Sequence, residues 1–318
     1  MRNSIFGGAA VLSLAIMVTG CGQQNANGPE VVTDRGPAAT AEAAGPKVFH
    51  ENWPEKVPSK GLAKGMALPL ETFMTSYADE IAVQQARDIA ETSCMRRYGF
   101  TNWRTEDLGV SPPVADNASN MPRRYGLSIL AEAEQYGYHT PNQAVESTPP
   151  PEQEVPEAAT VLQGKEGTEL VKSFKGDALP EGGCTGEVNR EVGDLDTGLV
   201  EQLSAESFEK SQATPAVKAA MGAWSSCMKG RGFEAATVWD TDELVGVQGP
   251  TATDKEIGIA TADVECKEET NLIKVWFDQE SVIQRELIKG NQASLSGART
   301  LSDKTLGAAA RLSATAGS

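Results

Sequence analysis

The strongest constraint on the fold is a cysteine motif that occurs twice in the chain. Residues 94–100 read CMRRYGF and residues 227–233 read CMKGRGF, so cysteine, methionine, glycine and phenylalanine recur at one spacing. The glycine stands where a helix takes a left-handed residue at its end, and the phenylalanine after it can contact the methionine. Each copy therefore predicts a helix end with a cysteine one turn before it. A reactive thiol is not indicated, because the C-terminal end of a helix disfavours a thiolate.

Capping residues and apolar spacing predict the helices that carry the motif. Thr214 and Pro215 fit the first positions of a helix that ends at Gly232. A first helix is expected from Ser76, where Asp79 completes a capping box. Its inward residues are Val83, Ala86, Ala90 and Cys94.

The longest helix is expected after Thr261, and a shorter one is closed by Gly137. The long helix would carry an apolar stripe formed by Val264, Leu272, Ile273, Trp276, Ile283 and Leu287. The stretch from Ser294 is built of small residues with isolated leucines, and we expect it to be mobile and to add little to the fold. Strand-like alternation is scarce, so the predicted fold is mostly α.

The other cysteines predict disulfides. Apart from Cys21, the chain has Cys94, Cys184, Cys227 and Cys266, with no C-x-x-C pair to suggest a redox centre or a zinc site. Four cysteines allow three pairings. The repeated motif favours Cys94 with Cys184 and Cys227 with Cys266, in a stapled helical body of two similar halves, 61–195 and 196–318, with long loops. A bond between the two motif cysteines, Cys94 and Cys227, stays open as the alternative.

The amino terminus predicts export and a lipid anchor. Residues 1–20 contain Arg2, an apolar run and then small residues, which is the layout of a secretory signal peptide. The ending VTGC resembles the lipobox of bacterial lipoproteins, in which the cysteine becomes the first mature residue and carries acyl chains such as palmitate. We therefore expect Cys21 to be lipidated and the protein to lie on the outer face of the cell membrane. The alternative is an uncleaved membrane anchor, but the apolar run is short for a spanning helix.

Residues 21–60 predict a flexible tether, because the stretch after Cys21 is rich in Gly, Ala, Pro, Asn and Thr. Removing residues 1–20, which hold one Arg and no acid, leaves 27 basic and 44 acidic residues, a mature charge of 27 − 44 = −17. Nucleic acid is not an expected partner for such a body, because phosphate binding depends on Lys and Arg clusters. The expected partners are the membrane, through Cys21, and an unknown protein or cell-wall component of the envelope.

With the lipobox, both C-M-x-x-x-G-F motifs and the stretch ADVECKEETNLIKVW in view, the chain resembles a group of cell-envelope lipoproteins from actinomycetes. The resemblance covers most of the mature body, and the Cys-Met-Gly-Phe spacing is its most specific part. It implies localisation and disulfides, and it implies no activity.

Catalytic signals are incomplete, and we predict no catalytic residue, metal ligand or cofactor. Only His50 and His139 are available for histidine chemistry, and both are expected at the surface. Three short patterns remain, namely a D-T-G tripeptide at Asp196 with Asp194 nearby, and S-x-x-K at Ser207 to Lys210 and at Ser226 to Lys229. The partner motifs of aspartic proteases and penicillin-binding enzymes are absent.

These features favour a non-catalytic binding or interaction module of the cell envelope. The alternative is a cell-wall hydrolase or acyltransferase, for which Ser207 and Lys210 would have to line one cleft.

Overall fold

The computed structural model describes residues 55, 57–103, 121–139, 156–246, 249 and 251–316. The predicted signal peptide, Cys21 and most of the predicted tether lie outside these residues. The described chain is mostly helical, as predicted from its sequence. None of its helices is long and apolar enough to span a membrane.

The elements follow one another along the described chain, with two small hairpins between helices. In order they are the 3-10 helix η2 (Pro69–Thr72), α1 (Tyr77–Arg97), α2 (Leu130–Tyr136), α3 (Pro156–Gln163), β1 (Lys165–Glu166), β2 (Glu169–Leu170), β3 (Ser173–Phe174), β4 (Asp177–Ala178), α4 (Gly183–Glu191), α5 (Gly198–Gln212), α6 (Pro215–Gly230), α7 (Thr241–Val245), α8 (Asp254–Glu269) and α9 (Leu272–Ala316). The antiparallel pairs are β1 with β2 and β3 with β4.

Both copies of the repeated motif end helices in the predicted way. In α6 the Phe233 amide donates to the Met228 carbonyl at 2.9 Å, and Gly232 has a φ of 92°. In α1 the Phe100 amide donates to the Met95 carbonyl at 3.2 Å. The predicted caps are present as well, since the Ser76 hydroxyl accepts from Asp79 and the Thr214 hydroxyl accepts from Val217. The motif is therefore a helix stop built from local hydrogen bonds.

The structure contains the pairing that the repeated motif favours. Cys94 is bonded to Cys184, and Cys227 is bonded to Cys266, with a Cα–Cα distance of 5.7 Å in each bridge. The first bridge joins the end of α1 to the start of α4 inside a small cluster that includes Met95. The second joins the last turns of α6 and α8.

The expected long helix after Thr261 is wrong in its boundaries. A helix begins earlier, at Asp254, because the Thr253 hydroxyl accepts from the Glu256 amide at 3.2 Å. It ends at Glu269, and Asn271, with a φ of 54°, separates it from α9. Cys266 consequently lies in the last turn of α8, so the disulfide joins two helix ends. A helix beginning after Thr261 would instead have placed Cys266 near a helix start.

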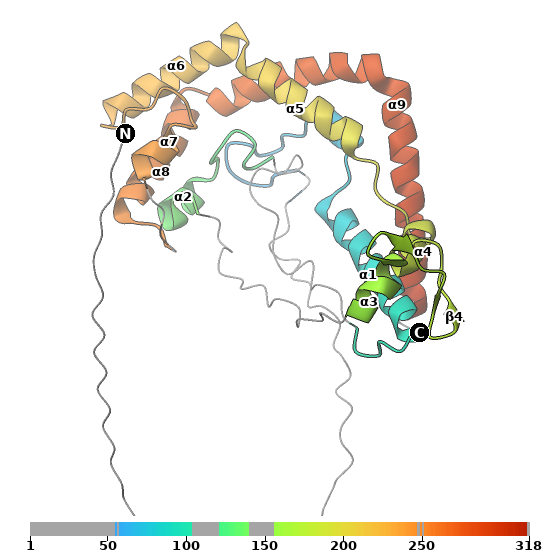
Figure 1. Cartoon of the computed structure of the whole chain (residues 1–318). Helices are drawn as coiled ribbons and strands as arrows, with labels where there is room; N and C mark the ends of the chain where they lie inside the picture. Colours follow the sequence, from blue (N-terminus) through green and yellow to red (C-terminus); the bar gives the residue numbers. More distant parts are fainter. Residues whose placement is uncertain are drawn as a thin grey trace, which may run out of the picture. The chain divides into compact units, whose positions relative to one another are not determined.

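The expected mobile tail from Ser294 is also corrected, because this stretch continues α9 as far as Ala316. Leu295 is buried with residues of η2 and α5, and Ala309 is buried with residues of α1 and α4. Figure 1 shows α9 beside α5 along one part and beside α1 along another. The small residues that suggested mobility instead allow close helix packing.

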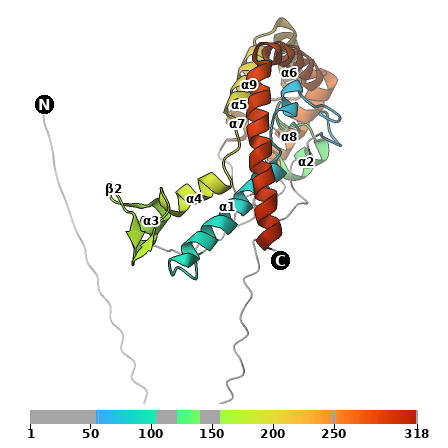
Figure 2. The same ribbon diagram turned by 90° about the vertical axis from the view of Figure 1, so that its right-hand side faces the viewer.

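The buried residues form several clusters that cross the predicted boundary between halves. The largest cluster contains Trp224, Ile259 and Trp276 and joins α6, α8 and α9. In a second cluster α9 packs against α1 and α4, which belong to the other predicted half. Figure 2 shows α1, α3 and α4 together, in agreement with their mutual contacts. Residues from both predicted halves therefore share buried clusters.

The packing of α9 predicts a large effect of truncation. Removing residues 294–318 exposes the clusters around Leu295 and Ala309, and burial of one leucine alone stabilises a fold by roughly 1.5–3 kcal/mol. We expect a clear drop in the melting temperature, measured by circular dichroism. Removing only residues 313–318 is the matched control and should change it little. Equal melting temperatures for the two truncated proteins would contradict the packing of α9.

Candidate functional site

The S-x-x-K residues are not brought together as a catalytic pair. Ser207 is fully buried, whereas 57% of the Lys210 side chain is exposed and its amine binds Glu206. In the second pattern Ser226 donates to a carbonyl of its own helix, and Lys229 pairs with Glu234. The geometry that an acyltransferase would need is not present at either pattern.

The D-T-G tripeptide holds a chain turn in place before α5. The Asp194 carboxylate accepts from Arg87 Nη1 at 2.8 Å, and the Asp196 amide donates to the Ser302 hydroxyl at 3.0 Å. Thr197 is the N-cap residue of α5, and its side chain makes no cap hydrogen bond. The Asp194 carboxylate is thus paired with Arg87, whereas the contact of Asp196 with Ser302 is made by its backbone amide.

His139 is buried, which corrects the expectation of a surface residue. Its Nε2 lies 3.5 Å from Glu256 Oε1, and its carbonyl accepts from Arg123 Nη2 at 3.2 Å. His50 and Cys21 lie outside the described residues. Within the described ranges, no group of three or more His, Cys, Asp or Glu residues is placed to hold a metal ion.

The main polar site of the described structure surrounds a segment that we call the strap, residues 121–139. The strap contains α2 and is separated from α1 and α3 by the stretches 104–120 and 140–155, which lie outside the described residues. Buried polar side chains fasten it to α5, α8 and α9. None of these contacts was identified as a site from the sequence.

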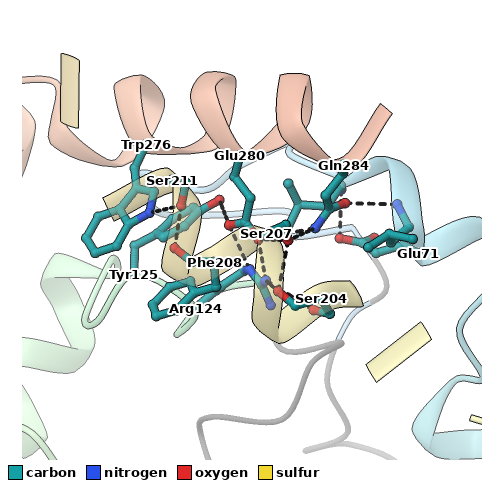
Figure 3. Close-up of polar contacts among 12 residues, drawn as sticks. Glu71, Arg124, Tyr125, Ser204, Ser207, Phe208, Ser211, Trp276, Glu280 and Gln284 are labelled. Atoms are coloured by element: carbon teal, nitrogen blue, oxygen red, sulfur yellow. Dashed lines mark hydrogen bonds and ion pairs between the residues drawn. The ribbon is translucent and has the colours of Figure 1, made fainter. Parts of the chain in front are cut away.

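Glu280 of α9 is the centre of the first set of contacts (Figure 3). Its carboxylate is fully buried and accepts from Arg124 Nε at 3.0 Å and also from Arg124 Nη2. It accepts from the Tyr125 hydroxyl at 2.8 Å and lies 2.8 Å from the Ser207 hydroxyl of α5. One carboxylate thus connects the strap, α5 and α9.

Arg124 has further partners on α5. Its Nη2 donates to the carbonyl and the hydroxyl of Ser204, each at 3.1 Å, and its guanidinium lies 5.3 Å from the centroid of the Phe208 ring. Burial by itself lowers the pKa of Arg124, but the hydrogen bonds and charge of Glu280 outweigh it and raise the pKa. The guanidinium is therefore held in its charged form.

Tyr125 lies in an aromatic stack whose polar end faces Glu280. Its ring stacks on Trp276 with a centroid distance of 5.1 Å and on Phe208 with a centroid distance of 6.3 Å. Burial, followed by the charge of Glu280, raises the pKa of the Tyr125 phenol well above that of a free tyrosine. The hydroxyl stays protonated and acts as a donor.

Gln284 extends the network toward the start of the described body. Its Nε2 donates to the Ser207 hydroxyl at 3.0 Å, and its Oε1 accepts from the Leu70 amide of η2 at 2.9 Å. Nearby, Glu71 accepts from the Leu68 amide at 2.8 Å. The network therefore fixes η2 as well as the strap.

A second set of contacts fastens the strap to α8 through a fully buried ion pair. Lys267 Nζ lies 2.9 Å from Asp263 Oδ2 and donates to the Leu127 carbonyl of the strap at 3.1 Å. Asp263 also accepts from Trp224 Nε1 at 2.9 Å. Gly126 has a φ of 82°, a conformation that residues with a side chain rarely adopt, and a Cβ there would lie 2.7 Å from Lys267 Nζ, so this position of the strap favours glycine.

This buried pair carries a cost in folding free energy. Burial raises the pKa of Asp263 and lowers the pKa of Lys267, and each partner offsets only part of the change. The carboxyl stabilises the fold most below about pH 4 and loses this contribution as the pH rises through its folded-state pKa. The amine stabilises it most above about pH 10 and loses this contribution as the pH falls. Between those limits a buried pair of this kind is not evidence of added stability.

The arrangement around Glu280 can position a segment, and it does not supply a reaction. Ser207 has no histidine or lysine among its hydrogen-bond partners, and its hydroxyl is satisfied by Glu280, Gln284 and the Ser204 carbonyl. A hydroxyl held in this way, inside the protein, is not an activated nucleophile. What the site does present is a set of acceptors matched to an arginine and a tyrosine.

One sequence signal for this site was available. Trp276, Glu280 and Gln284 follow each other at intervals of four, so they share one face of α9. Polar residues on an otherwise apolar face suggest buried partners. The identity of those partners depends on long-range packing and was not readable from spacing.

Comparisons with known proteins do not assign a family. No family model, no curated protein and no solved structure matches the chain.

The Glu280 network predicts a large loss of stability on removal of its charge. Glu280→Gln leaves the buried Arg124 guanidinium without its counter-charge, and breaking a buried pair in this way costs about 3–5 kcal/mol. The change in the free energy of unfolding is measured by urea unfolding, followed by tryptophan fluorescence. Glu286→Gln is the matched control, because 68% of that side chain is exposed. If the two substitutions lower the free energy of unfolding equally, the Glu280 network does not stabilise the fold as predicted.

The Lys267–Asp263 pair predicts a pH-dependent rescue. Lys267→Met leaves Asp263 buried and unpaired at pH 7 and should lower the free energy of unfolding by about 3–5 kcal/mol. The loss should shrink toward about pH 5, because a lone buried carboxyl takes up a proton. Adding Asp263→Asn removes the charge and keeps an acceptor for Trp224, so it should restore most of the stability at pH 7. The interpretation fails if the double variant is as unstable as the single one at both pH values.

Proposed function

We propose that this protein is an extracytoplasmic lipoprotein, anchored through Cys21, whose helical body is a non-catalytic binding or interaction module of the cell envelope. The observation that carries the proposal is the pair of disulfides within the body. Disulfides form and persist in oxidising compartments and are rare in the cytosol. They agree with the export signal that residues 1–20 predict.

In this proposal the anchor and the body are joined by the tether, residues 21–60. A flexible chain of about 35 residues has an r.m.s. span of roughly 30–35 Å, enough to hold the body clear of the lipid head groups. The net charge of −16 for the whole chain disfavours anionic lipid and nucleic acid as partners of the body. The resemblance to actinomycete lipoproteins points to the same location. The repeated helix stop is proposed as the trace of a two-half plan.

Binding is preferred to catalysis because of the chemistry found within the described residues. Ser207 is buried and hydrogen-bonded, the Asp194 carboxylate is paired with Arg87, and no group of residues placed to hold a metal ion occurs there. The alternative, a cell-wall hydrolase or acyltransferase, gains no specific support from Ser207 and Lys210. The buried polar site around Glu280 instead binds an arginine and a tyrosine of the strap.

The anchor is tested by Cys21→Ala. We expect the variant to remain an unprocessed precursor or to leave the membrane fraction, because the predicted body has no second lipid attachment. Detergent phase partitioning and the intact mass of the purified protein measure the outcome, since the wild type should carry the added mass of its acyl chains.

The control is Gln23→Ala, which changes a neighbouring residue of the tether and should leave processing intact. A Cys21→Ala protein that is processed normally and stays on the membrane would refute the lipoprotein proposal. It would leave the contacts of the helical body unaffected.

A further inference from the structure

The strap is seated on the body through the residue types that dominate protein interfaces. Arginine and tyrosine, anchored in buried sites that match them, supply much of the binding energy at such interfaces. Arg124 places two of its nitrogens on Glu280 and also lies over Phe208, while Tyr125 stacks on Trp276. In the contacts between strap and body around Glu280, the donors come from the strap and the acceptors from α5 and α9. This division resembles that between a ligand and a receptor.

The strap is also closed on itself. Arg123 donates from Nη1 to the Tyr138 carbonyl and from Nη2 to the His139 carbonyl, both at 3.2 Å. The same guanidinium lies 3.5 Å from Glu132 within α2. The beginning of the strap is thus bonded to its end by a side chain that belongs to the strap. Such a unit can separate from the body while keeping its internal contacts.

The charges under the strap favour basic partners. The body presents Glu280, Asp263 and Glu256 to it, and each accepts a hydrogen bond from a strap residue. Lys267 is already paired with Asp263. A competing segment would need a guanidinium for Glu280 and a flat aromatic ring for Trp276 and Phe208.

We propose that the site formed by Glu280, Ser204, Phe208 and Trp276 is an acceptor site for a protein segment that carries arginine followed by tyrosine, and that the strap occupies this site in cis. The inference rests on the proposed binding function and names its partner class. Binding of a partner then requires displacement of the strap, so the apparent affinity of the resting protein equals the intrinsic affinity multiplied by the small fraction of molecules in which the strap is displaced.

The test uses the mature, disulfide-bonded chain and a synthetic peptide of residues 121–139. In Arg124→Ala/Tyr125→Ala the strap no longer fills the site, and we expect this variant to bind the fluorescently labelled peptide at least roughly tenfold more tightly than the wild type. A peptide with alanine at the same two positions is the matched control and should bind at least about tenfold more weakly than the unaltered peptide, since it lacks both anchors. Adding Glu280→Gln to the variant should abolish the binding.

The outcomes separate clearly. A folded variant, with both disulfides and a cooperative melt, that binds neither peptide or binds both equally would overturn the proposal. Hydrogen exchange of the wild-type protein gives a second measurement if the variant does not fold. We then expect the backbone amides of α2 to exchange together and faster than those of α6 and α8. If the α2 amides exchange only when the whole protein unfolds, the proposal is overturned. These experiments need no membrane, so their failure is distinct from a failure of the Cys21 anchor.

Discussion

The buried carboxylate of Glu280 is the interaction on which most of the described structure depends. Removing a charge from water is costly, so a fully buried carboxylate must be surrounded by donors. Arg124 and Tyr125 supply them from the strap, Ser207 lies against it from α5, and Gln284 continues the contacts to η2. Segments far apart in the sequence must therefore be in place together. Apolar packing alone would tolerate small shifts between these segments, whereas a two-nitrogen contact on one carboxylate does not.

The disulfides and the buried charges constrain different parts of the body. Each disulfide fixes a helix end to another helix, and in the chain-entropy account it acts mainly by restricting the unfolded chain. The strap carries no cysteine, so its position is specified in the folded state by Glu280, by the Lys267–Asp263 pair and by buried side chains of its own such as Tyr125 and Leu127. A segment held by noncovalent contacts can be released and replaced, whereas a segment held by a disulfide needs redox chemistry. This difference is the physical reason to look for exchange at the strap.

Local chemistry decided which features were predictable from the sequence. The caps at Ser76 and Thr214 and the stops after Met95 and Met228 involve residues a few positions apart, and all four are present. The start of α8 was missed although Thr253 caps it, because the predicted apolar stripe begins only at Val264. The contacts of Glu280 span large separations along the chain, so no local pattern revealed them. The anchor at Cys21 stays a prediction.

The repeated motif illustrates why a repeat in sequence need not be a repeat in fold. Met95 and Met228 are both buried, and each closes its helix against the phenylalanine that follows. The cysteines beside them nevertheless meet different elements. Cys184 lies in the first turn of α4, whereas Cys266 lies in the last turn of α8. Because the stop is encoded within one turn, the same seven-residue pattern can end a helix beside a disulfide in different parts of the fold. The motif therefore specifies how a helix ends beside a disulfide, and the partner helix is determined by the apolar surfaces that pack around the bond.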